Sequence, residues 1–139
     1  MPAMTALPHS PAASVSASPL NTTAAFFQDA NTPPAELSPK RFVEVLGLDL
    51  QTLAAQARVH RNTLTRAPGS PSVQGFLRQV LRVLKAAEDL CGDRNQAVSW
   101  YRNEPLAVFE YQTPEALVAA GRADDVLRYI ASLEAGAAG

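Results

Sequence analysis

Residues 72–90 carry apolar side chains at helical spacing, and this long amphipathic segment limits the possible folds more than any other feature. The apolar positions are Val73, Phe76, Leu77, Val80, Leu81, Val83, Leu84, Ala87 and Leu90. A helix with so wide an apolar face needs other elements packed around it. Only 6% of the residues are aromatic, alanine is abundant, and no segment has the alternation of a strand. The sequence therefore predicts an all-α protein.

Three shorter helices are predicted before this segment. Ser38 followed by Pro39 is typical of a helix start, and Gly47 is typical of its end. Asp49 is the predicted N-cap of a second helix, because apolar residues at helical spacing follow it. After a break of three residues, a third helix is predicted over residues 61–66. A loop rich in proline and glycine then leads into the long helix.

Three further helices are predicted after the long one. Asp93 with Gln96 three residues later is a capping-box pattern, and it opens a helix through residue 100. Thr113 with Pro114 opens a very short helix, and a last helix is predicted over residues 123–134. Gly92 is the predicted end of the long helix. The predicted breaks after the three later helices lie at residues 103–105, Gly121 and Gly136, with residues 137–139 as a loose end.

Residues 1–37 differ in composition from the rest, and we expect a flexible tail there. Repeated prolines exclude a long helix, and the segment has little charge and few large apolar residues. Phe26 and Phe27 are the exception. One interpretation is that they dock on the folded body or on a partner. The composition of the segment favours the other interpretation, an incidental pair in a flexible tail. The predicted organisation is a tail over 1–37, a helix-turn-helix region over 38–90 and a C-terminal domain over 91–139.

Residues 53–66 have the pattern of a helix-turn-helix. Ala54 is small enough for two helices to approach, and Val59 and Leu64 are expected to hold the corner against the core. Arg58 stands at the turn position often filled by glycine, where a left-handed conformation costs roughly 1 kcal/mol. The residues predicted to contact DNA are Arg58, His60, Arg61, Asn62, Thr63 and Arg66. The alternative is that this pair of helices is an architectural remnant or forms a dimer contact.

Charge is divided between the two halves of the chain, although the whole chain has a net charge of −1. Residues 40–85 contain eight basic and two acidic side chains, whereas residues 86–139 contain four basic and nine acidic ones. This division indicates two surfaces with two different partners. The alternative is a fold whose two halves pair with each other.

Several classes of protein are excluded by the sequence. Cys91 is the only cysteine, so no disulfide forms within the chain, which is typical of the cytoplasm. No apolar run approaches the roughly 20 residues of a membrane helix, and the N-terminus is a poor signal peptide. His9, His60 and Cys91 lack metal-ligand spacing, and no glycine loop for phosphate is present. Adjacent Asp124 and Asp125 point apart on a helix. We therefore expect a cytoplasmic protein with no cofactor, no metal and no enzymatic activity.

The C-terminal half combines one tryptophan, two prolines and two glycines between short helices. The pattern consists of Trp100, Pro105, Pro114, Leu117, Gly121, Val126, Leu133 and Gly136. It resembles the toxin-binding domain of the Xre/MbcA/ParS antitoxin family, and with the upstream helix-turn-helix the resemblance covers about residues 38–136. Two residues depart from that pattern. Tyr101 stands where an aliphatic residue usually follows the tryptophan, and Tyr111 stands where the family often has glycine.

The resemblance implies an antitoxin of a type II toxin-antitoxin system, encoded beside a toxin that is most often of the RES-domain type. Such toxins consume NAD or use it for ADP-ribosylation, and the antitoxin covers the active-site cleft with its C-terminal domain. The resemblance also implies a homodimer within a hetero-oligomeric complex that binds its own promoter. A cleft for NAD is expected to be basic, which the acidic C-terminal half suits. The implied toxin-binding residues are Gly121, Arg122, Asp124, Asp125, Arg128, Glu134 and Gly136.

Two other functions remain open from the residues alone. One is a stand-alone transcriptional regulator whose C-terminal half serves only for dimerisation. The other is an interaction protein that has lost DNA binding, for which the irregular Arg58 at the turn is the supporting feature. Salt-dependent affinity for DNA separates the interaction protein, which lacks it, from the antitoxin and the regulator, which have it.

Overall fold

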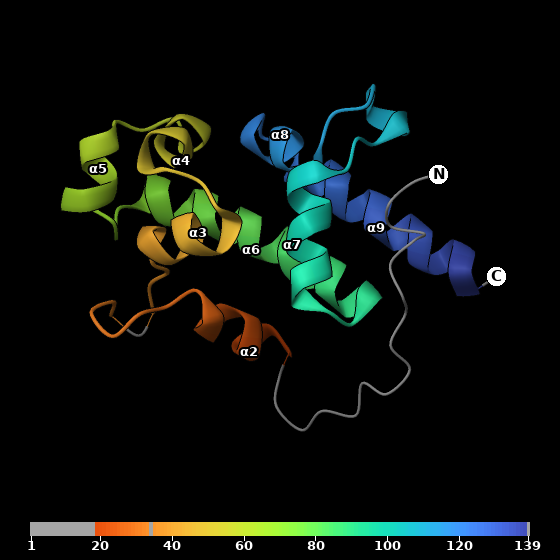
Figure 1. Ribbon diagram of the computed structural model, residues 1–139, viewed down its shortest axis with the longest axis horizontal. Coiled ribbons are helices and arrows are strands. Elements are labelled where there is room, and N and C mark those ends of the chain that lie inside the picture. The colour runs from red at the N-terminus through yellow and green to blue at the C-terminus, as the bar shows by residue number, and fades with distance from the viewer. Residues whose placement is uncertain (1–18, 34, 139) are drawn as a thin grey trace. The chain divides into compact units, whose positions relative to one another are not determined.

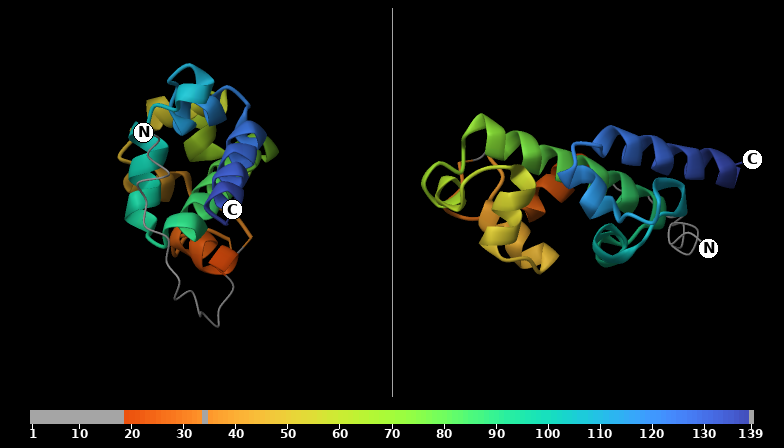
Figure 2. Two further views of the ribbon diagram at one scale, coloured as in Figure 1. Left: turned by 90° about the vertical axis from the view of Figure 1, so that its right-hand side faces the viewer. Right: turned by 90° about the horizontal axis from the view of Figure 1, so that it is seen from above.

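The computed structural model describes residues 19–33 and 35–138, which contain eight α-helices, one short 3-10 helix and no strand (Figures 1 and 2). The predicted all-α class is confirmed for these residues. The elements are α2 (Pro19–Phe26), α3 (Pro39–Leu46), α4 (Leu50–Ala57), α5 (Arg61–Arg66), α6 (Pro71–Cys91), α7 (Arg94–Asn103), η1 (Ala107–Phe109), α8 (Pro114–Ala119) and α9 (Ala123–Ala138).

The described residues divide into two compact units, and the division falls within α6. The N-terminal unit ends at Leu81 and contains α2 to α5 with the first half of α6. The C-terminal unit begins at Arg82 and contains the second half of α6 with α7 to α9. The long amphipathic helix therefore supplies apolar side chains to both units, as its wide apolar face requires.

Local capping determines where the helices of the N-terminal unit begin and end. The Ser38 hydroxyl accepts a hydrogen bond from the backbone N–H of Arg41 at 3.2 Å, with Pro39 at the first helical position. Gly47 ends α3 in the left-handed conformation, with φ of 69°. The Asp49 carboxylate accepts from the backbone N–H of Thr52 at 2.7 Å. These starts and stops confirm the predictions made from the sequence.

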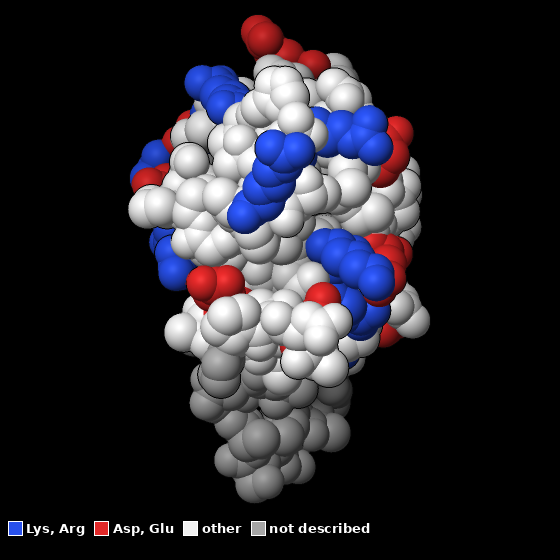
Figure 3. Space-filling model, turned by 90° about the vertical axis from the view of Figure 1, so that its left-hand side faces the viewer, with Lys and Arg blue, Asp and Glu red and all other residues white. Residues whose placement is uncertain are grey.

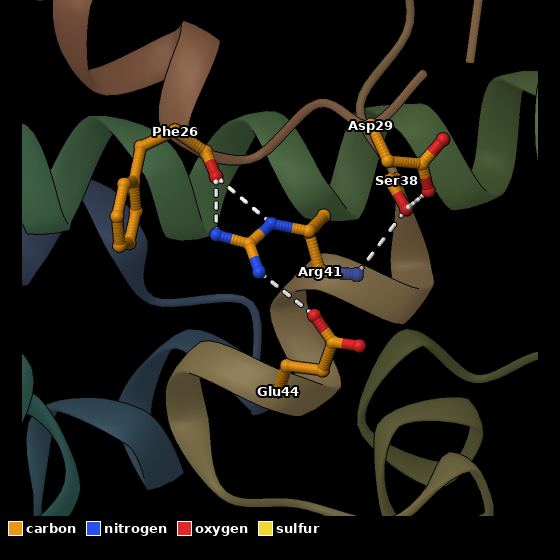
Figure 4. Close-up of polar contacts among 5 residues, drawn as sticks. All are labelled: Phe26, Asp29, Ser38, Arg41 and Glu44. Atoms are coloured by element: carbon orange, nitrogen blue, oxygen red, sulfur yellow. Dashed lines mark hydrogen bonds and ion pairs between the residues drawn. The ribbon is translucent and has the colours of Figure 1, made fainter. Parts of the chain in front are cut away.

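The segment before α3 differs from the predicted flexible tail. Phe27 is fully buried and stacks on Phe42, with ring centroids 4.2 Å apart. The Arg41 guanidinium donates two hydrogen bonds to the carbonyl oxygen of Phe26, and Asp29 accepts a hydrogen bond from the Ser38 hydroxyl at 2.8 Å (Figure 4). The difference arises because one large ring has a complementary ring to pack on, which offsets the poor composition around it. Residues 1–18 lie outside the described residues.

A buried glutamine also holds this segment in place. The Gln74 side chain on α6 accepts from the backbone N–H of Leu37 at 2.9 Å and donates to the carbonyl of Leu37 at 2.9 Å. Its amide donates a further hydrogen bond to the carbonyl of Pro68 at 2.8 Å. Gln74 thus satisfies backbone groups that are removed from water, which is the condition for burying an amide in a core.

The C-terminal unit packs around large apolar side chains of α7, α8 and α9 and of the loop after α7. Those exposed by 3% or less include Trp100, Tyr101, Leu106, Leu117, Val118, Val126 and Ile130. The Thr113 hydroxyl caps α8 with Pro114 at its first position, and Gly121 has φ of 82° before α9. This left-handed residue allows the chain to reverse between the two helices.

Two predictions about helix ends in this unit are wrong. Gly136 does not terminate α9, which continues to Ala138. A single glycine costs only about 1 kcal/mol within a helix, and the alanines around it favour continuation. Asp93 caps α7 as predicted, through the backbone N–H of Asn95, but the capping box is incomplete. The Gln96 carbonyl oxygen is buried without a hydrogen-bond partner among the described residues, so it does not reach back to Asp93.

Candidate DNA-binding and partner-binding surfaces

Helices α4 and α5 and the turn between them form the predicted helix-turn-helix. Arg58 ends α4 with φ of 59° and ψ of 41°, which confirms the left-handed conformation predicted at this position. Ala54 is 2% exposed and Leu64 is 3% exposed, so both lie in the core of the corner as expected. Val59 is half-buried, and its N–H donates to the carbonyl of Ala54 at 3.0 Å. The turn is therefore closed by backbone hydrogen bonds despite its non-glycine residue.

The side chains predicted to contact DNA lie mainly on the surface of this motif. Those of Arg58, His60, Arg61, Asn62 and Arg66 are exposed, and that of Thr63 is half-buried. No ion pair within the described residues involves any of the three arginines. Figure 3 views the molecule from the side on which α4 and α5 lie, and it shows separate basic side chains on a largely uncharged surface, some of them beside acidic ones. Such cations are available for phosphates and base edges.

His60 has a structural role besides the predicted contact with DNA. Its Nδ1 accepts a hydrogen bond from the backbone N–H of Asn62 at 3.1 Å, and His60 is the N-cap residue of α5. The ring nitrogen thus satisfies a backbone N–H in the first turn of α5, in place of the side-chain oxygen that usually does so. The position directly before the helix was the available signal, although histidine is not a preferred capping residue.

The residues implied as toxin-binding are partly paired within the C-terminal unit. Arg122 donates to Asp125 at 2.9 Å, and Arg128 pairs with the same carboxylate. These two hydrogen bonds lower the pKa of Asp125 below its ordinary value. Asp124 lies 3.6 Å from Arg82. The acidic start of α9 is therefore largely balanced by arginines, which the sequence count of charges did not reveal.

Other members of the implied set are exposed and carry no such partner. Glu134 and Gly136 lie on the exposed part of α9, and Gly121 is exposed at the reversal before it. Glu104 and Glu110 were outside the predicted set, but neither they nor Glu134 form an ion pair within the part of the chain that the structure describes. The unpaired negative charge of this unit therefore lies away from the first turn of α9.

Residues 106–112 form a tight loop between Pro105 and Pro114, where the sequence predicts a bend. The backbone N–H of Leu106 donates to the carbonyl of Gln112 at 3.0 Å, and the N–H of Tyr111 donates to the carbonyl of Leu106 at 2.8 Å. Glu110 and Tyr111 both have positive φ, at 59° and 64°. The departure noted at Tyr111 thus falls on a left-handed position, where glycine is the least strained residue.

Trp100, which belongs to the pattern of the C-terminal half, lies in the core and is 3% exposed. Its Nε1 and the hydroxyl of Tyr101 have no hydrogen-bond partner among the described residues. Burial raises the pKa of Tyr101 far above its ordinary value, and the charge of Glu115 adds to the effect. Pro114 is buried at the start of α8, whereas Pro105 is exposed. The pattern residues therefore include both core and surface positions.

Comparison of the chain with family models, curated proteins and solved structures finds no match. Within the described residues, no group of three or more His, Cys, Asp and Glu side chains is arranged to hold a metal ion. None of the helices there combines the length and the apolar character that crossing a membrane demands.

Proposed function

We propose that this protein is the antitoxin of a type II toxin-antitoxin system, with DNA binding and toxin neutralisation assigned to its two units. The observation that carries the proposal is the helix-turn-helix, which presents unpaired arginines in a unit separate from the acidic C-terminal one. The partner proposed is a RES-domain toxin that consumes NAD or uses it for ADP-ribosylation. The protein itself is proposed to have no catalytic role.

The DNA-binding part of the proposal rests on α5 as recognition helix. Arg61 and Arg66 stand at its two ends, and both are exposed. Guanidinium groups suit the acceptors of guanine in the major groove and the phosphates beside it. Repression of its own operon would then follow from occupancy of the promoter. Electrophoretic mobility shifts with that promoter at several salt concentrations measure this activity.

The neutralising part of the proposal rests on the C-terminal unit. A cleft that binds the diphosphate of NAD needs basic side chains, and Glu104, Glu110 and Glu134 supply complementary charge. The exposed end of α9 is proposed to enter the cleft. Removal of residues 134–139 spares the buried Val126 and Ile130, so this truncation tests the element without removing the core.

The decisive experiment is growth of cells that express the neighbouring gene alone, with the full chain, or with the chain lacking residues 134–139. Arrest by the neighbouring gene and rescue by the full chain are expected, and the truncated chain is expected to rescue less. Western blotting confirms equal expression of both forms. Absence of arrest, or arrest that the full chain does not relieve, would overturn the proposal.

A second candidate is a stand-alone transcriptional regulator that dimerises through its C-terminal unit. The pairing of Asp124 and Asp125 with arginines favours it, because fewer acidic groups then remain for a basic cleft. Such a protein would bind its promoter normally and leave the growth of the arrested cells unchanged. The same growth experiment therefore separates the two candidates.

A further inference from the structure

The loop over residues 106–112 presents apolar side chains to solvent. Val108 is 69% exposed and Tyr111 is 70% exposed, and these are the large apolar side chains most exposed in the described part of the chain. Scattered single apolar residues on a surface are ordinary, but these two belong to one closed loop.

The backbone of the loop is strained at Tyr111 and at the residue before it. Glu110 and Tyr111 are consecutive and left-handed, although neither is glycine, asparagine or aspartate. Glycine at either position would relieve that strain, and the exposed ring of Tyr111 contributes little to the core. Strained backbone persists where surrounding structure fixes it, and it is concentrated at functional sites. The chain therefore keeps a costly side chain at a position where folding does not require one.

Neighbouring side chains of α9 and the residue before it pack against the loop. The Phe109 ring meets the Tyr129 ring edge to face, with centroids 5.9 Å apart. The guanidinium carbon of Arg122 lies 5.3 Å from the centroid of Phe109, and Asp125 fixes that guanidinium through a hydrogen bond of 2.9 Å. A loop that is ordered before binding loses little conformational entropy when it binds. This is the condition for a preorganised contact surface.

We infer that Val108 and Tyr111 insert into an apolar pocket of the neutralised toxin, and that Glu110 pairs with a basic group at the edge of that pocket. The inference rests on the proposed function, since the toxin is the occupant it names. A nucleotide-binding cleft combines both features, because it accommodates planar rings on apolar walls and phosphates on basic side chains. Tyrosine in such a pocket is among the residues that dominate binding energy.

The charge of the loop favours this occupant over the others. Glu110 is exposed between the two apolar residues and forms no ion pair within the described residues. A second copy related by a two-fold axis through this loop would bring two Glu110 carboxylates together. DNA would place phosphates against the same carboxylate. A partner with a basic group is attracted to Glu110 and avoids both of these repulsions.

The test measures affinity of the purified full chain for the purified product of the neighbouring gene by isothermal titration calorimetry. Tyr111→Gly removes the ring and relieves the backbone, so we expect affinity to fall at least tenfold while the unfolding midpoint is unchanged or raised. Val108→Ser is expected to weaken binding as well. Tyr111→Phe keeps the ring and is the matched control, with affinity expected within about threefold of the original.

Each outcome decides between the inference and the function on which it rests. If the original chain binds and Tyr111→Gly binds equally well, the loop inference is overturned and the proposed function stands. If the original chain does not bind at all, the proposed function falls and the loop inference falls with it. If sedimentation shows that the original chain is a dimer and Tyr111→Gly a monomer, the loop contacts a second copy, which also overturns the inference.

Discussion

The Phe27 ring lies against the Phe42 ring with centroids 4.2 Å apart and planes 26° from parallel. Both side chains are fully buried, and the carbonyl of Phe27 accepts a hydrogen bond from the N–H of Ser38 at 2.9 Å. The stacked pair therefore joins the segment that includes α2 to the first turn of α3. This contact makes the segment around Phe27 part of the folded N-terminal unit.

Replacement of Phe27 by alanine is expected to lower the free energy of unfolding by about 3–5 kcal/mol, because it leaves a cavity against Phe42. Urea denaturation followed by circular dichroism measures the change. Phe26→Ala is the control, since Phe26 is only half-buried, and its effect is expected to be smaller. Equal effects of the two variants would show that the stacked pair is not the main contact.

Replacement of Gln74 by leucine is expected to destabilise the N-terminal unit by about 3 kcal/mol. Leucine has a similar size, but it leaves the N–H and carbonyl of Leu37 and the carbonyl of Pro68 without their partner. Buried backbone groups that lose a partner each cost about 1–3 kcal/mol. Hydrogen exchange at Leu37 is expected to accelerate in the variant. Unchanged exchange there would mean that the glutamine does not protect this amide.

Stability is expected to fall in acid partly through Asp29. Hydrogen bonds from Ser38, Thr32 and the backbone of Asn31 lower the pKa of this carboxyl below its ordinary value. A lowered pKa in the folded state contributes stability above the unfolded pKa of about 3.9, and this stability is lost as the pH falls toward the folded pKa. Unfolding midpoints measured from pH 6 downward are expected to decrease less steeply for Asp29→Asn. Identical slopes for both proteins would contradict this role.

Simultaneous replacement of Arg61 and Arg66 by alanine is expected to weaken promoter binding and to reduce the slope of log affinity against log salt by about 2. The reason is that both exposed guanidinium groups are proposed to contact DNA. Fluorescence anisotropy at several salt concentrations provides the slope. Arg128→Ala removes an exposed arginine from the C-terminal unit and serves as control. The variant without Arg61 and Arg66 is expected to retain toxin neutralisation. An unchanged slope for that variant would exclude α5 from the DNA contact.

The helix boundaries could be predicted because short-range chemistry sets them. Ser38, Asp49 and Thr113 act through hydrogen bonds to residues three positions later, so the necessary information lies in adjacent sequence. The left-handed Arg58 was predictable for the same reason, because the helix-turn-helix pattern requires that conformation at its turn. The exposed face of α5 then follows from the burial of Leu64.

The remaining features depend on contacts that a local pattern does not contain. The docking of Phe27 requires a ring from another helix, and composition alone favoured a tail. The loop around Tyr111 contradicts local propensity, since two residues that disfavour positive φ adopt it. Such conflicts between local preference and observed structure are expected at functional or strained sites.

The two glycines of the C-terminal pattern are expected to respond oppositely to alanine. Gly136 lies within α9, and an added Cβ would meet nothing within 4 Å, so Gly136→Ala is expected to stabilise the unit by about 0.5–1 kcal/mol. Gly121 has the same open surroundings but φ of 82°, so Gly121→Ala is expected to destabilise by about 1 kcal/mol through backbone strain alone. Urea denaturation of both variants measures the pair. Loss of stability in Gly136→Ala would indicate that α9 ends at this glycine after all.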